Sequence, residues 1–209
     1  MRRTALVTGA AGGIGALAAR RLAAAAWDVV AVDIDEAGLA ETALRSPNMH
    51  VRTCDVTDPK AVLDVLAVIG PVHRVVHAAV IAPAAPVLEQ PPAEVQHVLS
   101  TDVLGTMHIV RATLPGMLER GAGDLVLCAP PPEPGAAAAA SGAVAAYAGA
   151  LFREHGGRGV TIRCVHLDGE TPARLVLDAL DRSFARPAGD LHVRPRRGRL
   201  PFARAAAPR

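Results

Sequence analysis

A glycine-rich segment near the N-terminus constrains the fold of this chain more than any other feature. Thr8-Gly9-Ala10-Ala11-Gly12-Gly13-Ile14-Gly15 follows a short apolar run and precedes a long pattern rich in alanine and leucine. Glycines at such spacing permit a tight turn between a strand and a helix, and they let a pyrophosphate approach the helix N-terminus. The segment therefore predicts a nucleotide-binding turn with the candidate residues Gly9, Gly13, Ile14 and Gly15. The alternative is a strand–helix turn that binds nothing.

Short β-branched runs alternate with longer helical patterns along the rest of the chain. This alternation is typical of βαβ units, so we expect an α/β, Rossmann-type, doubly wound parallel sheet of about seven strands with helices on both faces. The expected strands are Ala5–Thr8, Val29–Asp33, His50–Asp55, Arg74–His77, Leu125–Ala129, Thr161–Leu167 and, as a candidate seventh, Asp190–Val193. The expected helices are Gly13–Ala26, Glu36–Leu44, Pro59–Ile69, Ala93–Leu118, Ala136–His155 and Pro172–Ser183.

The composition is that of a globular protein. Of the 209 residues, 51% are hydrophobic and only 2% are aromatic, so we expect one domain over residues 1–194 with a core of Ala, Val and Leu. No stretch approaches the roughly 18 apolar residues of a membrane span, and the N-terminus has no leader pattern. We expect the three cysteines to be small buried residues in a reducing, cytoplasmic setting: Cys54, Cys128 and Cys164.

The C-terminus differs in charge from the rest of the chain. Six arginines and no acid follow Leu191, so we expect a basic, flexible tail over residues 195–209. Removing these six from the 22 basic residues leaves 16, against 20 acidic residues. A net negative body argues against nucleic acid as a partner. The histidines and acids show no metal-ligand spacing.

Asp33 stands at the expected end of the second strand, 18 residues after Gly15. An acid at this place would accept hydrogen bonds from both ribose hydroxyls and would repel a 2′-phosphate. Because no arginine occurs in the glycine segment, Asp33 favours NAD over NADP as the cofactor.

The pattern Thr-Gly-x-x-x-Gly-Ile-Gly, with Cys54-Asp55-Val56-Thr57 after the third strand, resembles the short-chain dehydrogenase/reductase family. The likeness extends to Val98–Thr106 and to Arg153–Val160, so it covers most of the chain. The resemblance implies that Asp55 hydrogen-bonds the adenine amino group and that Val56 packs on the ring. The family's Asn-Asn-Ala-Gly becomes His77-Ala78-Ala79-Val80, which adds Ala78 to the cofactor-binding residues and places a branched Val80 where glycine admits the nicotinamide-side ribose.

The resemblance does not extend to the catalytic residues of the family. Its members use a Tyr-x-x-x-Lys pair on one helix, whereas this chain has one tyrosine, Tyr147, and one lysine, Lys60, far apart. By the same alignment the asparagine, serine, tyrosine and lysine positions fall on Asp102, Pro130 (or Ala129), Ala137 and Ser141. Carbonyl reduction needs a proton donor tuned by a nearby cation, and a group that holds the oxygen. These residues supply neither.

The substrate lid is also shortened. The Pro-Gly that closes over the nicotinamide in the family becomes Leu167-Asp168, and Gly169–Pro172 leads almost directly into the next helix. We therefore expect a shallow cleft that is open to water.

Three functions remain open from the residues. The first is a pseudo-oxidoreductase that keeps NAD and acts as a partner or scaffold, associating with itself or with an active paralogue through the two long helices. The second is a non-redox cyclase, isomerase or lyase of bacterial specialised metabolism, with Asp102 and His166 as weak catalytic candidates. The alternative for Asp102 is a surface or N-terminal charge of a helix without a catalytic role. The alternative for His166 is a histidine that is merely tolerated at the rim of the cleft. Residual NAD-dependent oxidoreductase activity ranks last. The family's residues that are missing here are those that would contact the nicotinamide and the substrate, whereas those for adenine and pyrophosphate are kept. We therefore expect ADP-ribose to bind about as well as NAD.

Overall fold

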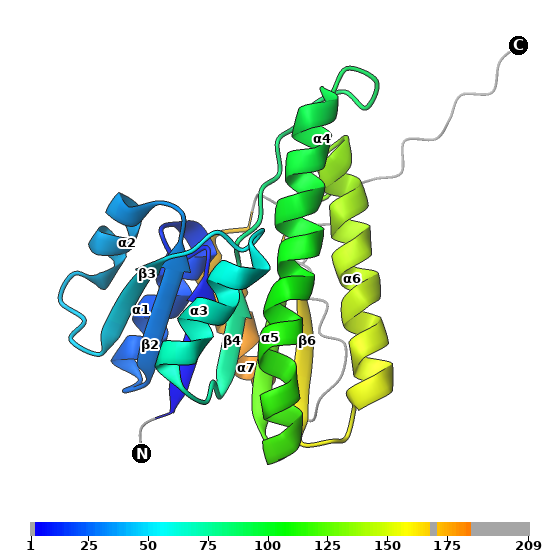
Figure 1. The fold of residues 1–209 in the computed structure, drawn as a ribbon. Coiled ribbons are helices and arrows are strands. Elements are labelled where there is room, and N and C mark those ends of the chain that lie inside the picture. The colour runs from blue at the N-terminus through cyan, green and yellow to red at the C-terminus, as the bar shows by residue number, and fades with distance from the viewer. Residues whose placement is uncertain (1–2, 168–170, 185–209) are drawn as a thin grey trace, which may run out of the picture.

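The computed structural model describes residues 3–167 and 171–184 of the chain. In these ranges six parallel strands form one sheet in the order β3-β2-β1-β4-β5-β6, with helices on both faces (Figure 1). The expected Rossmann-type α/β fold is confirmed. The described sheet has six strands and not seven; the candidate strand Asp190–Val193 and the whole tail, residues 195–209, lie outside the described residues.

The strands and helices alternate along the chain as their residue patterns predict. The strands are β1 (Thr4–Thr8), β2 (Asp28–Asp33), β3 (Met49–Thr53), β4 (Arg74–His77), β5 (Gly123–Ala129) and β6 (Val160–His166). The helices are α1 (Gly13–Ala24), α2 (Glu36–Ala43), α3 (Pro59–Ile69), α4 (Pro92–Val98), the π-helical η1 (Leu99–Leu104), α5 (Gly105–Arg120), α6 (Ala136–His155) and α7 (Ala173–Phe184).

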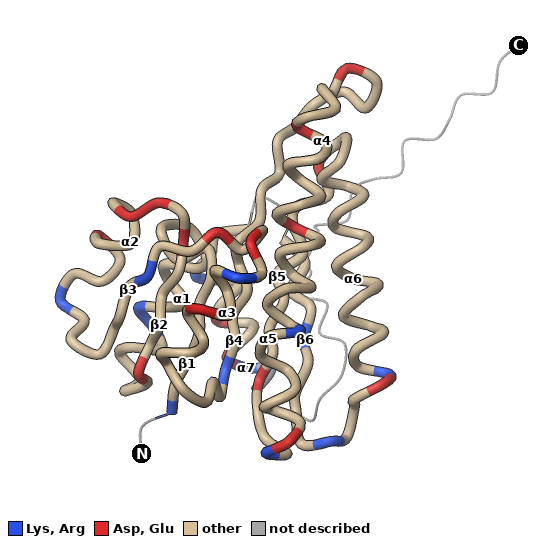
Figure 2. The backbone as a smooth tube through the Cα atoms, in the orientation of Figure 1, with Lys and Arg blue, Asp and Glu red and all other residues tan. Residues whose placement is uncertain are grey.

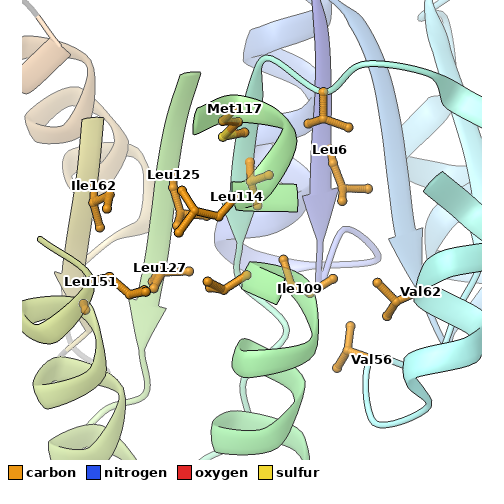
Figure 3. Close-up of a cluster of buried hydrophobic side chains, with 14 of the residues drawn as sticks. Leu6, Val56, Val62, Ile109, Leu114, Met117, Leu125, Leu127, Leu151 and Ile162 are labelled. Atoms are coloured by element: carbon orange, nitrogen blue, oxygen red, sulfur yellow. The ribbon is translucent and has the colours of Figure 1, made fainter. Parts of the chain in front are cut away.

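Two hydrophobic layers fix the sheet between its helices. Helices α3, α5 and α6 cover one face, and α1, α2 and α7 cover the other. Figure 3 shows the first layer, in which Ile109, Leu114 and Met117 of α5 pack near Leu125 and Leu127 of β5. Each of these five side chains is at most 4% exposed. The core is aliphatic, as a chain with 2% aromatic residues requires.

The expected helix Ala93–Leu118 is not one regular helix. Its middle, η1, is π-helical, and α4, η1 and α5 follow one another without a loop. The hydroxyl of Thr106 donates to the backbone carbonyl of Asp102, a local bond that competes with the regular helical pattern. π-turns inside helices change which side chains face a neighbour. Together, α4 and the start of α6 extend beyond the strands (Figure 1).

Trp27 precedes β2 and lies at the amino-terminal end of the parallel strands. Its ring is 5% exposed and lies between two guanidinium groups, those of Arg3 at 4.3 Å and of Arg74 at 4.7 Å from the ring centroid. Arg74 also donates to the Asp124 carboxylate at 2.7 Å. These contacts close the end of the sheet that is remote from the carboxyl ends of the strands.

Candidate functional site

The glycine turn between β1 and α1 closes against the end of β4. Gly9 has a φ of +66°, and a Cβ there would lie 2.4 Å from the carbonyl oxygen of Ala78. A Cβ on Gly15 would lie 2.1 Å from the carbonyl oxygen of Gly9. The fold itself therefore requires these two glycines. Gly13 also has a positive φ, +53°, but its missing Cβ would meet nothing within 4 Å.

The N-terminus of α1 is open. Its N-cap residue, Gly12, offers no side-chain cap, and the first turn carries no acidic residue. The backbone N–H groups of such a helix end are hydrogen-bond donors at the positive pole of the helix dipole. Gly12, Gly13 and Ile14 all line the cavity described below. The arrangement favours an anion, above all a phosphate group.

Asp33, the last residue of β2, is held beside this turn. One carboxylate oxygen accepts the backbone N–H of Ala11 at 3.0 Å, and the other accepts that of Asp35 at 3.1 Å. Each oxygen of a carboxylate can accept further bonds. Asp33 therefore lies within the cavity wall, beside the glycine turn, where hydroxyl groups of a ligand can reach it.

Asp55 and Val56 form the next part of the wall. The strand β3 ends at Thr53, two residues earlier than expected, so Asp55 lies in the loop. Oδ1 of Asp55 accepts the N–H of Thr57 at 2.8 Å. Val56 is buried against the start of α5, where a Cβ on Gly105 would lie 2.8 Å from Val56 Cγ2. This contact seats α5 directly on the β3–α3 loop.

A cavity of about 770 Å³ runs along the carboxyl ends of the strands. This volume lies within the range of small-molecule and cofactor pockets. Of the eight predicted cofactor-binding residues, seven line the cavity: Gly9, Gly13, Ile14, Asp33, Asp55, Val56 and Ala78. Gly15 lies behind Gly9 and does not. Val80 also lines the cavity, as the alignment implies.

The charged groups on the wall are acidic. Asp33 and Asp55 line the cavity, and His97 is the basic side chain on it; within the described ranges no lysine or arginine does. Acidic segments are prominent in Figure 2 above α2, β3 and α3. A phosphate in this cavity would therefore be held by backbone N–H groups, and an extra phosphate beside Asp33 would meet a negative field.

Asp102 lies inside the protein and not on the cavity wall. Its side chain is fully buried in η1, and Oδ1 accepts the backbone N–H of Ile81 at 2.8 Å. Oδ2 has no hydrogen-bond partner within the part of the chain that the structure describes. Burial raises the pKa of Asp102 from 3.8 to about 7. Asp102 lies directly behind the cavity wall, because its partner Ile81 and its neighbour Thr101 both line the cavity.

The other positions aligned with the family's catalytic residues are buried too. Pro130, Ala137 and Ser141 are all buried, and none lines the cavity. In the same helix, Ala136 and Ala140 pack against Val98 of α4. The first turns of α6 are thus covered by α4 and η1.

His166 and Leu167 lie at the carboxyl end of β6, and only one of them reaches the cavity. His166 ends β6, is partly buried and does not line the cavity, so the structure does not join it to Asp102 there. Leu167 does line the cavity. Asp168 lies outside the described residues. His77 is fully buried, its Nδ1 lies 2.7 Å from the Thr8 hydroxyl, and burial lowers its pKa to about 4. It is a core residue.

One face of α4 and η1 forms a polar part of the wall that sequence reasoning missed. Its side chains come from Ala93, Gln96, His97, Ser100 and Thr101. The four polar ones make no hydrogen bond to any residue in the described ranges. The spacing of three and four residues is visible in the sequence and places them on one face of a helix. What the sequence does not show is that this face points into the cavity.

None of the helices within residues 3–167 and 171–184 has the length and apolar character needed to cross a bilayer. The same ranges hold no group of three or more His, Cys, Asp and Glu residues placed to bind a metal ion.

Comparison with known proteins places these features in a family. The model of the family described as short chain dehydrogenase matches residues 3–171. The chain is 32% identical over 195 residues to 2-dehydro-3-deoxy-L-rhamnonate dehydrogenase (NAD(+)) of Sphingomonas sp., covering 87% of this chain and 76% of that protein. It is 33% identical over 121 residues to 2-keto-3-deoxy-L-fuconate dehydrogenase of Xanthomonas campestris pv. campestris, covering 58% and 40%.

Structural comparison also supports membership of this family. Actinorhodin polyketide ketoreductase, solved with NADPH, superposes with a TM-score of 0.74 and 28% identity, covering 79% of this chain and 69% of that one. For most of the curated relatives, the match spans about half of their length or less. The family match covers most of this chain, and the sheet, the glycine turn and Asp33 agree with it. The chain therefore belongs to the short-chain dehydrogenase/reductase family.

Proposed function

We propose that this chain binds an adenine dinucleotide, NAD in preference to NADP, without transferring hydride, and that it acts as a partner or scaffold subunit. One observation carries the proposal. Seven of the predicted nucleotide-binding residues line the cavity, whereas none of the four residues aligned with the family's catalytic positions does. Members of the family that are named as dehydrogenases argue for the nucleotide; the residues of this chain argue against the reaction.

The order of the strands supports the nucleotide. The glycine turn follows β1, Asp33 ends β2 and Asp55 follows β3, and these three strands are neighbours in the sheet. A ligand whose pyrophosphate lies at the N-terminus of α1 would present its ribose to Asp33 and its base to the β3–α3 loop. The carboxylate of Asp33 accepts hydroxyl groups and repels a 2′-phosphate, which favours NAD over NADP.

The chemical half of the cavity gives little support to hydride transfer. Near the ends of β4, β5 and β6 the wall is formed by Val80, Ile81, Pro131 and Leu167. None of these side chains can donate a proton or hold a developing oxyanion. A non-redox enzyme using Asp102 and His166 lacks support for a related reason, since neither side chain lines the cavity.

A role as a partner subunit is supported by the surface of α6. Ala138, Ala139, Gly142 and Ala146 are exposed on this helix, and small side chains allow another helix to approach closely. We propose association with a second copy or with an active paralogue through α5 and α6. Buried thiols at Cys54 and Cys128 support a cytoplasmic location.

Calorimetric titration with NAD, NADP and ADP-ribose tests the nucleotide part. We expect ADP-ribose to bind within about threefold of NAD, since only the adenine half is gripped, and NADP to bind at least about tenfold more weakly. A large preference for NAD over ADP-ribose, or oxidation of NADH with any carbonyl compound by the purified chain, would contradict the proposal. Absence of all binding would make the glycine turn a structural relic.

Size-exclusion chromatography with light scattering tests the partner role. We expect a dimer or larger assembly, alone or with a co-expressed paralogue, that Ala139→Glu and Gly142→Glu break. Arg158→Glu, at an exposed residue after α6, serves as the control for added negative charge. A chain that stays monomeric alone and with every paralogue tested would contradict this role.

A further inference from the structure

A second cavity, of about 320 Å³, lies at the amino-terminal ends of β1 and β2 beside the edge strand β3. Its volume is at the lower end of the range for small-molecule sites. It shares no lining residue with the cavity that contains the glycine turn. We call it the edge groove, and it is lined by Thr4, Asp28, Val30, His50, Arg52, Val68 and Ile69.

The groove exists because α3 does not cover the edge of the sheet. Val62 and Val65 of α3 are buried in the hydrophobic layer that also contains Val30 of β2. His50 and Arg52 of β3 project from the same face of the sheet, since His50 pairs in register with Val30, but both remain exposed. In Figure 1, β3 stands clear of α3 at the edge of the sheet. Two polar side chains therefore border the groove where a helix would otherwise pack.

The β3 side of the groove is a source of positive charge and hydrogen-bond donors. Nη1 of Arg52 donates to the backbone carbonyl of Val51 at 3.1 Å. Neither Arg52 nor His50 forms an ion pair within residues 3–167 and 171–184. A guanidinium group with unused donors matches the planar geometry of a carboxylate, and the adjacent imidazole supplies a further donor.

The opposite end of the groove is electronegative. Asp28 begins β2 there, and α3 ends there with Val68 and Ile69 on the wall. The last turn of α3 has no basic residue, and its C-cap residue is Gly70. The carbonyl groups at such a helix end form the negative pole of the helix dipole. Between the two charged ends, Val30 and Val68 make the wall apolar.

We propose that the edge groove binds a linear zwitterion, an ω-amino carboxylate. Its carboxylate lies at Arg52 and His50, its ammonium group lies at Asp28 and the end of α3, and its methylene chain lies on the apolar wall between them. Val32, which pairs with Arg52, is four residues after Asp28, so the two ends are about 13 Å apart along the strands. A simple carboxylate is repelled at Asp28 and a simple amine at Arg52. Because the groove is separate from the nucleotide cavity, it does not require a bound nucleotide.

Calorimetric titration with 6-aminohexanoate, hexanoate and hexylamine tests this site, because the second and third compounds each lack one charge. We expect 6-aminohexanoate to bind with a dissociation constant on the order of 1 mM, and the other two about fivefold more weakly, as the loss of one exposed ion pair implies. Arg52→Gln should weaken 6-aminohexanoate about fivefold and leave hexylamine unchanged. Arg45→Gln, at an exposed arginine off the groove, is the matched control for the lost charge.

Nuclear magnetic resonance locates the ligand without any variant. Titration with 6-aminohexanoate should shift the amide signals of residues 50–52 and 68–69, with or without ADP. Shifts at residues 9–15 instead would place the ligand in the nucleotide cavity and overturn the proposal. Equal binding of the three compounds, unchanged affinity in Arg52→Gln, or no saturable binding of 6-aminohexanoate would overturn it as well. None of these results bears on nucleotide binding.

Discussion

The side-chain oxygen of Gln90 accepts the backbone N–H of Ala136 at 2.7 Å, so a residue before α4 caps the first turn of α6. Gly135 precedes that turn with a φ of +91° and offers no side-chain cap; a Cβ there would lie 2.3 Å from Gln90 Oε1. The amide nitrogen of Gln90 donates to Glu94 at 2.8 Å. A single buried side chain thus joins α4 to the helix that carries Ala137.

Replacing this cap should destabilise the chain. Gln90→Leu keeps the approximate volume but leaves the buried N–H of Ala136 without its acceptor, and we expect a loss of about 1–3 kcal/mol in the free energy of unfolding. Urea denaturation measures it. Glu89→Ala, at the exposed neighbour, should stay within about 0.5 kcal/mol. Equal midpoints for the two variants would show that water replaces the cap.

The buried carboxyl of Asp102 should make stability depend on pH. Its pKa is about 7 in the folded chain against 3.8 ordinarily, so folding favours the protonated form. The stability that protonated Asp102 contributes is therefore fully present below pH 3.8 and is lost as the pH rises through about 7. The free energy of unfolding falls by at most about 4 kcal/mol over this range. Asp102→Asn retains an acceptor for Ile81 and cannot ionise.

We expect Asp102→Asn to be more stable than the parent at pH 8 and to lose this advantage toward pH 4. Urea denaturation of both chains across this range gives the difference, in which the other titrating groups cancel. Glu89→Gln, at an exposed carboxyl, should give a curve parallel to the parent. A constant difference between Asp102→Asn and the parent would mean that Asp102 keeps its ordinary pKa.

Two glycines of the same turn should differ in their response to alanine. Gly15→Ala places a Cβ 2.1 Å from the Gly9 carbonyl oxygen, and we expect a loss of about 2 kcal/mol or more. Gly12 has an extended backbone, with φ at −159°, and its Cβ would meet nothing within 4 Å. Gly12→Ala should stay within about 0.5 kcal/mol. Thermal unfolding of the pair decides whether the turn has the geometry described.

Removing the charge of Asp33 should relax the choice of cofactor. Asp33→Asn eliminates the repulsion of a 2′-phosphate, so the ratio of NADP to NAD affinity should rise about tenfold at low salt and less at high salt. Calorimetry with both ligands gives the ratio. Asp35→Asn is the matched control, because Asp35 caps α2 through Gly38 and does not line the cavity. A ratio that shifts equally in both variants would point to the general field of the acidic rim.

Local patterns were sufficient to predict the main features of this molecule. The alternation of β-branched and helical runs predicts the order of the elements, and the glycine spacing with Asp33 predicts the lining of the cavity beside α1. Both rest on residues close in sequence. The boundaries that moved did so by about two residues; β3 ends at Thr53 and not at Asp55, and β5 begins at Gly123 and not at Leu125.

The features that escaped prediction depend on contacts between distant segments. Gln90 meets Ala136 across 46 residues, and Asp102 meets Ile81 across 21. The second contact joins the loop after β4 to the π-helical η1, in which Asp102 is buried while Ser100 and Thr101 line the cavity. The wall of the cavity likewise combines distant segments, since residues of α4 and η1 line it together with Leu167, Thr171, Ala173 and Val176 after β6.

Trp27 is the sole tryptophan of the chain, and it lies at the opposite end of the strands from the cavity. Its indole is buried and contacts the guanidinium groups of Arg3 and Arg74, and unfolding of the sheet removes both contacts and exposes the ring. Intrinsic fluorescence therefore reports global unfolding from a point remote from any bound nucleotide. Trp27 is thus an intrinsic fluorescence probe of unfolding, and stabilisation of the chain by a ligand can be measured without attaching a dye.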